Sequence, residues 1–308
     1  MDEAPKQPPS VTARLARPLR QLTVEALAGE WFMGHARLTI EGAPARPTSQ
    51  LAGRVRGALG AVLQASASAE ALAGRPCPWR PPSALDLLFR SQGRITPALE
   101  IPKPVVLALR REDRLLHVEL GLVGFASECL EEVAAALVHA WRHRIPEVRG
   151  SRIVDRVIGS TEGVAVPAGA QAVLMVFESP LELRWRDGGP ASAAAALWGL
   201  LASLGNRVSG LARWQDAEIL ADWPGLRARA AGLDLACLAN DSERWQRRSF
   251  RQGRTIPMRG DRPVLRLAGD LQPFLPWLAL GAVTHVGSHA ALGMGRYRLL
   301  IEDGTTSE

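Results

Sequence analysis

The sequence predicts an α+β protein built from two similar domains, and three observations support this fold class. Apolar residues switch along the chain between the period of strands and the period of helices. The first half places these signals in the order strand, helix, two strands, helix, strand, which is the split βαβ or ferredoxin-like arrangement. The second half repeats the order more loosely. We therefore expect a tail at 1–13 and two tandem ferredoxin-like domains at 14–165 and 166–308.

The first domain opens with a predicted strand and a predicted helix. Alternating apolar residues in HARLTIEG predict the strand, and the turn-prone EGAPARP leads to Thr48 and Ser49, which are suitable helix caps. The apolar residues of 48–64 then share one helical face, with Arg54 and Arg56 on its flanks.

The rest of the first domain is a predicted hairpin, a helix and a strand. Residues 104–124 form two extended runs around a charged turn at Arg110–Arg114. Ser127 is a suitable cap for the next helix, whose apolar residues recur every three or four positions as far as Trp141. The segment SRIVDRVIG supplies the closing strand.

The second domain is predicted from the same kinds of signal. Residues 172–185 predict a strand and 191–208 an apolar helix, followed by a polar, helical connection to about Asn240. Extended segments then run through RTIPMRGDRPVLRLAG, LQPFLPWLALGAV predicts the second helix, and MGRYRLLIE predicts the last strand.

The charge of the chain favours a polyanionic partner. The net charge is +6 with a sequence pI of about 10.1, and the only lysines are Lys6 and Lys103. Arginine suits phosphate, although an Arg-rich composition also arises in high-GC genomes. Cys77, Cys129 and Cys237 fit neither a disulfide framework nor a zinc site, so we expect a reducing, cytoplasmic setting without a signal peptide or membrane span.

A glycine-rich segment, HVGSHAALGMG, lies between the last predicted helix and the last predicted strand. Glycine adopts positive φ and lets backbone N–H groups approach a ligand closely, so such a turn beside a helix end is a natural seat for an anion. The same spacing is also common in turns that bind nothing. The expected RNA contacts here are His285, Gly287, Ser288, His289, Gly293 and Gly295.

The order of these segments resembles the RAMP superfamily of CRISPR-associated proteins, and within it the endoribonucleases that process precursor RNA. That superfamily carries a loop G-h-G-x5-G-h-G, with h apolar, between the last helix and last strand of a second ferredoxin-like domain. Here the loop is H-V-G-x5-G-M-G, with His285 in place of the first glycine. LAGRVRGALG resembles the first helix of that branch, GLVGFASECLEEVAAAL its second, FESPLEL the start of its second domain, and RRSFRQGRTIPMRG the approach to the loop.

This resemblance implies that the chain cleaves CRISPR repeat RNA into guide RNAs without a metal or another cofactor. The 2′-hydroxyl next to the scissile phosphate attacks in line and leaves a cyclic phosphate and a 5′-hydroxyl. The implied partner is a repeat RNA, expected to form a hairpin, and other subunits of a CRISPR interference complex are a further class of partner. The chemistry needs a base, a proton donor and cations or N–H donors at the phosphate.

Three residues are candidates for these catalytic roles. Members of the branch that use histidine generally carry it between the first strand and the end of the first helix. His35 is the only histidine in this part of the chain, and it departs from that pattern because it lies before the predicted strand. Histidine suits acid or base chemistry, but a structural or exposed role is also common at such a position. Arg54 and Arg56 lie on the matching helix and are candidates to stabilise the pentavalent phosphate; the alternative is a solvated helix face. The resemblance also allows cleavage that relies on arginines without an essential histidine, as in some relatives.

The densest basic run is RWQRRSFRQGR, in which Trp245 and Phe250 alternate with arginines. This composition combines phosphate contacts with base stacking, and the alternative is a basic surface hairpin. The expected RNA contacts are Arg244, Arg247, Arg248, Arg251 and Arg254.

Two other functions fit the same sequence. The chain can bind repeat RNA as a subunit of an interference complex without cutting it, which the absence of a histidine at the usual place favours. It can also be a basic α+β scaffold with no role in RNA binding.

Overall fold

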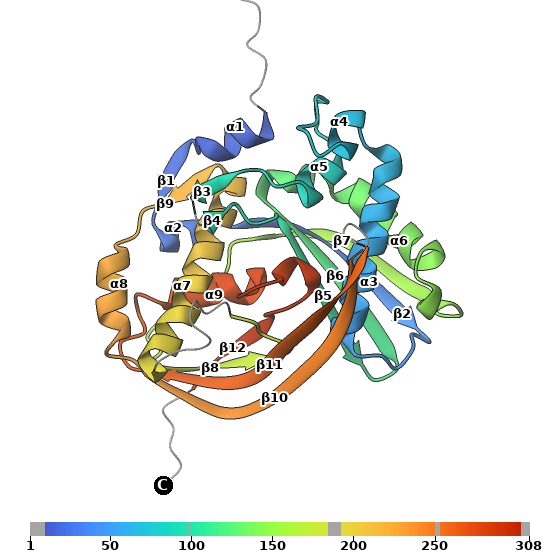
Figure 1. The fold of residues 1–308 in the computed structure, drawn as a ribbon. Coiled ribbons are helices and arrows are strands. Elements are labelled where there is room, and N and C mark those ends of the chain that lie inside the picture. The colour runs from blue at the N-terminus through green and yellow to red at the C-terminus, as the bar shows by residue number, and fades with distance from the viewer. Residues whose placement is uncertain (1–9, 98, 184–191, 250–252, 303–308) are drawn as a thin grey trace, which may run out of the picture.

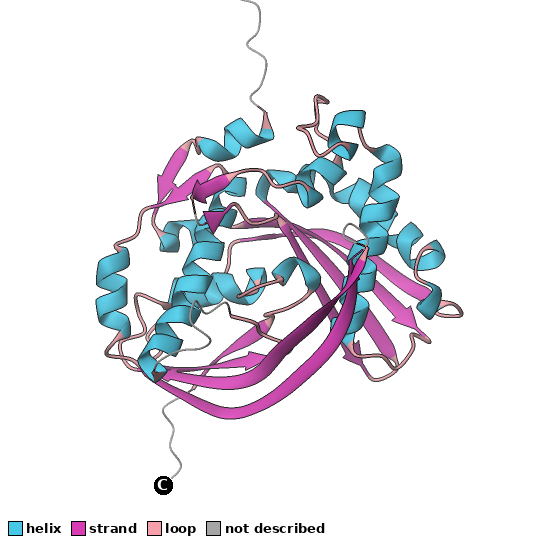
Figure 2. Cartoon of the chain, viewed as in Figure 1, coloured by secondary structure: helices cyan, strands magenta, loops and turns pink. Residues whose placement is uncertain are grey.

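The computed structural model describes residues 10–97, 99–183, 192–249 and 253–302 of the chain. Its helices and strands form two βαββαβ units, each with one four-stranded antiparallel sheet (Figures 1 and 2). Among the described residues, no helix is long and apolar enough to cross a membrane.

The first unit contains the predicted elements in the predicted order. Its strands lie in the order β5-β6-β2-β7, in which the first strand of the unit pairs with the third and the fourth, as in a ferredoxin-like sheet. Its elements are β2 (Phe32–Glu41), α3 (Thr48–Leu63), β5 (Val105–Glu112), β6 (Leu115–Val123), α6 (Leu130–His143) and β7 (Arg152–Glu162).

The second unit repeats this topology, so the prediction of two tandem ferredoxin-like folds is confirmed. Its strands lie in the order β10-β11-β8-β12. Its elements are β8 (Ala172–Phe177), α7 (Ala193–Ala212), β10 (Asp234–Ser249), β11 (Arg254–Ala268), α9 (Leu275–Thr284) and β12 (Tyr297–Ile301).

Shorter elements connect and extend the two units. The strand β1 pairs in parallel with β9, which joins the beginning of the chain to the second half. The remaining elements are α1 (Val11–Ala16), β1 (Arg20–Leu22), α2 (Val24–Gly29), η1 (Gln64–Ser66), α4 (Ala69–Leu72), α5 (Ala84–Phe89), β3 (Arg94–Thr96), β4 (Leu99–Glu100), η2 (Gly124–Cys129), η3 (Pro146–Val148), η4 (Arg213–Gln215), β9 (Ala217–Ile219), α8 (Trp223–Ala230) and η5 (Ala290–Leu292).

The alternation of β2 determines which side chains enter the core. Ala36, Leu38 and Ile40 are fully buried, and a Cβ on Gly34 would meet Leu130 and Ser127 at 3.0 Å, so the even-numbered residues face α6. One continuous cluster of buried apolar residues runs through both units. The two units therefore pack together as one body around that cluster.

The hairpin of β10 and β11 is much longer than the rest of its sheet. β11 pairs with β8 only over Val264–Ala268, whereas it pairs with β10 as far as Arg254. We call the two-stranded extension, residues 240–249 and 254–263, the arm. In Figure 1 the arm curves across the molecule to α3 of the first unit.

Four local predictions were wrong. Val11–Ala16 form α1 with Val11 buried, so 11–13 are not a solvated tail. Neither Thr48 nor Ser49 caps α3, whose N-cap is Pro47; the Ser49 hydroxyl donates to Glu243. Ser127 does not cap α6, because its hydroxyl accepts from the Gly34 N–H and donates to the Leu122 carbonyl. The polar connection is not helical up to Asn240, since β10 begins at Asp234.

Candidate nucleic-acid interface

The inner face of the arm is fixed to α3 and to the glycine-rich segment. Alternate residues of β10 point the same way, so Glu243, Trp245 and Arg247 share one face. The Ser49 hydroxyl at the start of α3 donates to Glu243. Trp245 is 7% exposed and packs in a small apolar cluster with Met294 of the glycine-rich segment. The predicted stacking of RNA bases on Trp245 is therefore wrong in this conformation.

Glu243 is held from two directions. It accepts the Ser49 hydroxyl from α3 and forms an ion pair with Arg262 on the neighbouring strand of the arm. Both carboxylate oxygens of Glu243 are thereby occupied, which fixes the position of β10 along α3. The next side chains on this face of β10 are placed by that contact.

Arg247 lies on α3 beside Arg56. A Cβ on Gly53 would contact Arg247 Cγ and Cδ at 3.4 Å, so the glycine leaves just enough room for the arginine stem. Arg56 follows Gly53 by three positions on α3, and the charge of Arg247 lowers the pKa of Arg56. Two guanidinium groups from opposite halves of the chain are therefore brought together, as the sequence could not show.

Arg56 is enclosed by apolar and backbone groups. Its guanidinium lies 4.5 Å from the Phe89 ring centroid and Nη2 donates to the Leu88 carbonyl at 3.4 Å. Burial, and secondarily the charge of Arg247, lower the pKa of Arg56 to about 10. Within the described part of the chain, neither Arg56 nor Arg247 forms an ion pair with a carboxylate, and Arg247 Nε is buried without a hydrogen-bond partner. Such a pair is suited to an anion that supplies the missing negative charge.

Arg54 has a different environment from Arg56. Its guanidinium is exposed and forms an ion pair with Glu147 at 3.2 Å. The two arginines predicted together on this helix therefore have different surroundings, and Arg56 is the one on which the charge of Arg247 acts.

The outer face of the arm is also basic. Arg244 is exposed and lies directly opposite Arg259 on β11, which is exposed as well. Like charges in directly opposite positions of a sheet repel each other, and a phosphate between them relieves the repulsion. Arg259 was missed from the sequence, where only the two-residue alternation of a hairpin could have paired it with Arg244. Arg254 is exposed near the end of the arm, whereas Arg251 and the Arg248 side chain lie outside the described residues.

His35 is separated from Arg56 by the sheet. It lies inside β2 rather than before it, between Gly121 and Gly159 of the neighbouring strands. Its side chain is on the face opposite the one that packs on α6, and Gly159 leaves room for it, since a Cβ there would approach His35 Nε2 to 3.0 Å. Helices α3 and α6 pack together on the other face. His35 and Arg56 are therefore not brought to one site.

His285 is part of the interior. It ends α9 with a φ of 64°, is 3% exposed, and its Nδ1 has no hydrogen-bond partner among the described residues. Burial and the charges of Arg207 and Arg296 lower the pKa of His285 to about 3. The imidazole is therefore neutral and enclosed, and the predicted contact of His285 with RNA is wrong in this conformation.

The glycines of this segment pack against protein rather than leave open space. A Cβ on Gly287 would approach the Glu182 carbonyl to 2.6 Å, and one on Gly295 would overlap the Val286 carbonyl. Gly293 faces the first unit, where a Cβ would lie 3.1 Å from Ala52 Cβ of α3. All three glycines have φ between 72° and 83°. Gly293 therefore allows close contact with α3, whereas Gly287 and Gly295 allow the segment to pack against its own unit.

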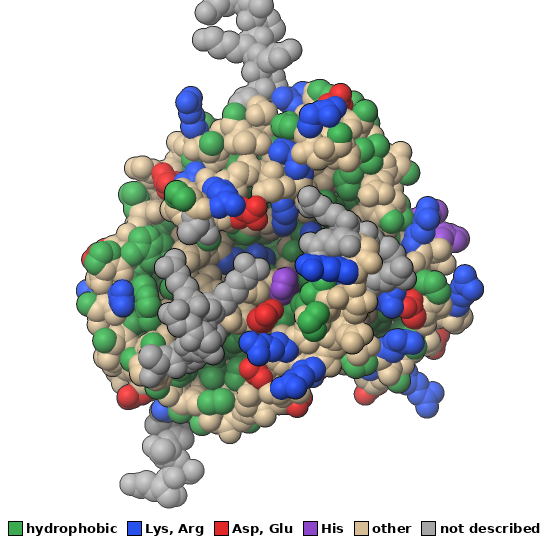
Figure 3. Space-filling model, in the orientation of Figure 1, with side chains coloured by type: hydrophobic (Ala, Val, Ile, Leu, Met, Phe, Trp, Pro, Cys, Tyr) green, Lys and Arg blue, Asp and Glu red, His purple; other side chains and the backbone are tan. Residues whose placement is uncertain are grey.

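Ser288 and His289 form the accessible part of the segment. Both are partly exposed, the Ser288 N–H donates to the Glu182 carbonyl at 2.8 Å, and His289 Nε2 lies 3.5 Å from a Glu182 carboxylate oxygen. Figure 3 shows a hollow near the centre of this face of the molecule, with Lys, Arg and His side chains around it and Asp or Glu side chains among them. In the described ranges, no three His, Cys, Asp or Glu side chains are grouped so as to hold a metal ion.

Comparison with known proteins supports the fold through structure rather than sequence. No protein-family model and no curated protein matches the chain. Two Cas6 structures, each a product complex, match with TM-scores of 0.52 and 0.51, both at 16% identity, over 89% and 88% of this chain and 100% and 99% of theirs. A partial Cas6-RT-Cas1–Cas2 complex matches with a TM-score of 0.51 at 11% identity, over 91% of this chain and 48% of that one.

These neighbours define the class of fold to which the chain belongs, a tandem ferredoxin-like protein. More particularly, the chain has the fold of the Cas6 proteins along nearly its whole described length. The resemblance inferred from the order of the sequence motifs is thus confirmed for the fold.

Proposed function

We propose that the chain is an endoribonuclease that cleaves CRISPR repeat RNA at the junction of α3 and the arm. The observation that carries this proposal is the Arg56–Arg247 pair, two neighbouring cations without a carboxylate partner among the described residues. The shared fold with Cas6 product complexes supports the choice of substrate.

In this proposal the RNA 2′-hydroxyl attacks the adjacent phosphorus and the bond to the 5′-oxygen breaks. The products are a 2′,3′-cyclic phosphate and a 5′-hydroxyl; the 2′-hydroxyl loses its proton and the leaving oxygen gains one. Negative charge builds up on the phosphate oxygens in the transition state, where Arg56 and Arg247 stabilise it. Arg244 and Arg259 hold the RNA backbone on the outer face of the arm, and Ser288 and His289 contact it near the glycine-rich segment.

The test is a single-turnover cleavage assay of repeat RNA by the purified chain in the presence of EDTA. We expect a cyclic phosphate and a 5′-hydroxyl in the products. A matched RNA with a 2′-deoxy nucleotide at the scissile position should bind and stay intact. Cleavage of that deoxy RNA, or cleavage that stops on chelation, would contradict the proposed chemistry.

A second candidate function is RNA binding without cleavage. It is favoured by the position of His35, which faces away from Arg56, and by the ion pair that engages Arg54. Tight binding of the repeat RNA without products, under all ionic conditions, would establish this candidate and reject the endoribonuclease.

A further inference from the structure

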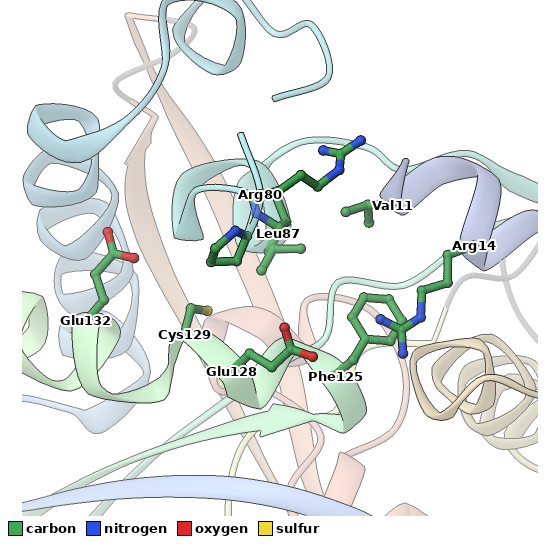
Figure 4. Close-up of a pocket in the computed structure, with 10 residues that line it drawn as sticks. Val11, Arg14, Arg80, Leu87, Phe125, Glu128, Cys129 and Glu132 are labelled. Carbon is green, nitrogen blue, oxygen red and sulfur yellow. The ribbon is translucent and has the colours of Figure 1, made fainter. Parts of the chain in front are cut away.

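A groove beside the first unit is lined mainly by α1, residues 80–82, α5, η2 and η4, together with Phe32 of β2 and Glu132 of α6. A cavity of about 280 Å³ lies between α1, residues 80–82, α5 and η2 (Figure 4). A hollow of about 450 Å³ adjoins it and shares Arg14, Phe125 and Glu128 with it. The two form one groove along η2, which no residue of the Arg56–Arg247 site lines.

The floor of the groove is apolar. Val11, Leu87 and the Phe125 ring line it, and the Arg14 guanidinium lies flat over that ring, 3.8 Å from its centroid. Arg14 Nε and Nη2, on one edge of the guanidinium, donate to the two carboxylate oxygens of Asp216. Arg14 therefore contributes a wall to the groove but little net charge.

With the Arg14–Asp216 pair set aside, the lining of the groove carries two carboxylates, Glu128 and Glu132, against one cation, Arg80. Glu128 and Glu132 line one side, and within the described part of the chain neither forms an ion pair with a cation; Glu132 accepts the Ser66 hydroxyl at 2.8 Å. Between them, Cys129 has a pKa raised to about 12 by burial and by both carboxylates. Arg80, the other cation of the lining, donates to the Trp79 carbonyl at 2.8 Å. Phosphate groups are repelled by such a site, and a cationic group is attracted.

Two large apolar side chains are exposed on the stretch of chain between α3 and α5. Trp79, adjacent to Arg80 in sequence, is 48% exposed, and Leu72 on the neighbouring helix α4 is 55% exposed. Exposed tryptophan and other large apolar side chains are typical of protein-protein interfaces.

We propose that this groove binds a segment of a partner protein that inserts a lysine or arginine side chain between apolar neighbours. The aliphatic stem of that residue would lie on Phe125 and Leu87, and its charge would pair with Glu128 and Glu132. The inference goes beyond RNA cleavage and does not depend on it, because the groove and the α3–arm junction share no residue.

The test uses the full chain and the peptide N-acetyl-Leu-Arg-Leu-amide, followed through the methyl NMR signals of Val11 and Leu87. We expect saturable shifts of these signals, and at least about tenfold weaker binding of the matched peptide with glutamate in the centre. The double variant E128Q/E132Q should weaken the arginine peptide by about tenfold as well. The control is Glu131→Gln, since Glu131 pairs with Arg156 and does not line the groove.

Four results would overturn the proposal. They are the absence of saturable shifts, equal binding of both peptides, full binding by E128Q/E132Q with an unchanged melting temperature, or displacement of the peptide by a uridine oligonucleotide. The last result would make the groove an RNA site.

Discussion

Replacing Arg247 with glutamine tests two effects of its charge at the α3–arm junction: repulsion of Arg56 in the RNA-free protein and attraction of an RNA phosphate. In the RNA-free protein, Arg247 disfavours the charged form of Arg56. An Arg56 pKa of about 10 in place of 12.5 corresponds to about 3 kcal/mol against the charged form. Burial is the larger cause, so the share of Arg247 is on the order of 1 kcal/mol.

The substitution should therefore weaken RNA binding without weakening the fold. Loss of a charged hydrogen bond to phosphate costs about 1.5–3 kcal/mol, or roughly 10-fold to 150-fold in affinity. The free energy of unfolding should stay constant or rise by up to about 1 kcal/mol, since the repulsion on Arg56 is relieved. Fluorescence anisotropy with repeat RNA and urea denaturation measure the two quantities.

The matched control is Arg227→Gln on α8, an exposed arginine whose loss changes the net charge equally. The slope of log K against log salt should decrease by about 1 for the Arg247 variant and stay near its original value for the control. If the Arg247 variant binds and cleaves like the Arg227 variant, the reasoning about this junction fails.

Three further perturbations test other parts of the structure. Gly253 and Gly295 have similar φ, but a Cβ on Gly295 would overlap backbone whereas a Cβ on Gly253 would meet open space. In urea denaturation, Gly295→Ala should lower the free energy of unfolding by several times the roughly 1–2 kcal/mol expected for Gly253→Ala. Equal losses would refute the packing role of Gly295. His35→Ala should leave the cleavage rate within about twofold, whereas loss of a catalytic base lowers it by about 10²–10⁴. Burial holds the pKa of His285 in the folded protein at about 3, below its value in the unfolded chain. Below about pH 6.5 the unfolded chain therefore binds a proton that the folded protein does not, and the free energy of unfolding decreases by about 1.4 kcal/mol per pH unit. A His285→Gln variant should show a flatter stability profile between pH 7 and 5, and an identical profile would contradict this.

The order of elements could be predicted because hydrophobic periodicity is a local property of the sequence. The alternation of Ala36, Leu38 and Ile40 identifies β2 without reference to the rest of the chain. The first residues of β10, DLACLA, could not be identified in this way, because their apolar residues do not alternate strictly and their pairing with β11 decides that they form a strand. Likewise, serine is a common helix cap, so Ser49 was a reasonable candidate. Its hydroxyl donates to Glu243 instead, and that contact depends on the path of the arm.

The sequence predicted individual residues of the candidate site, but not which of them lie together in space. Arg56 and Arg247 were each expected to contact phosphate, and only the register of the arm on α3 brings them together. The same register turns Trp245 inward, so an aromatic residue that suits base stacking serves packing instead. His285 looked accessible in a glycine-rich loop and is buried because the glycines close the loop onto the protein.

The central claim is that an RNA phosphate occupies the space between α3 and the arm. The most direct measurement is a crystal structure of the chain with repeat RNA carrying a 2′-deoxy nucleotide at the scissile position. We predict a phosphate oxygen within hydrogen-bond distance of the guanidinium groups of both Arg56 and Arg247. RNA bound elsewhere, with these two arginines remote from every phosphate, would contradict the claim.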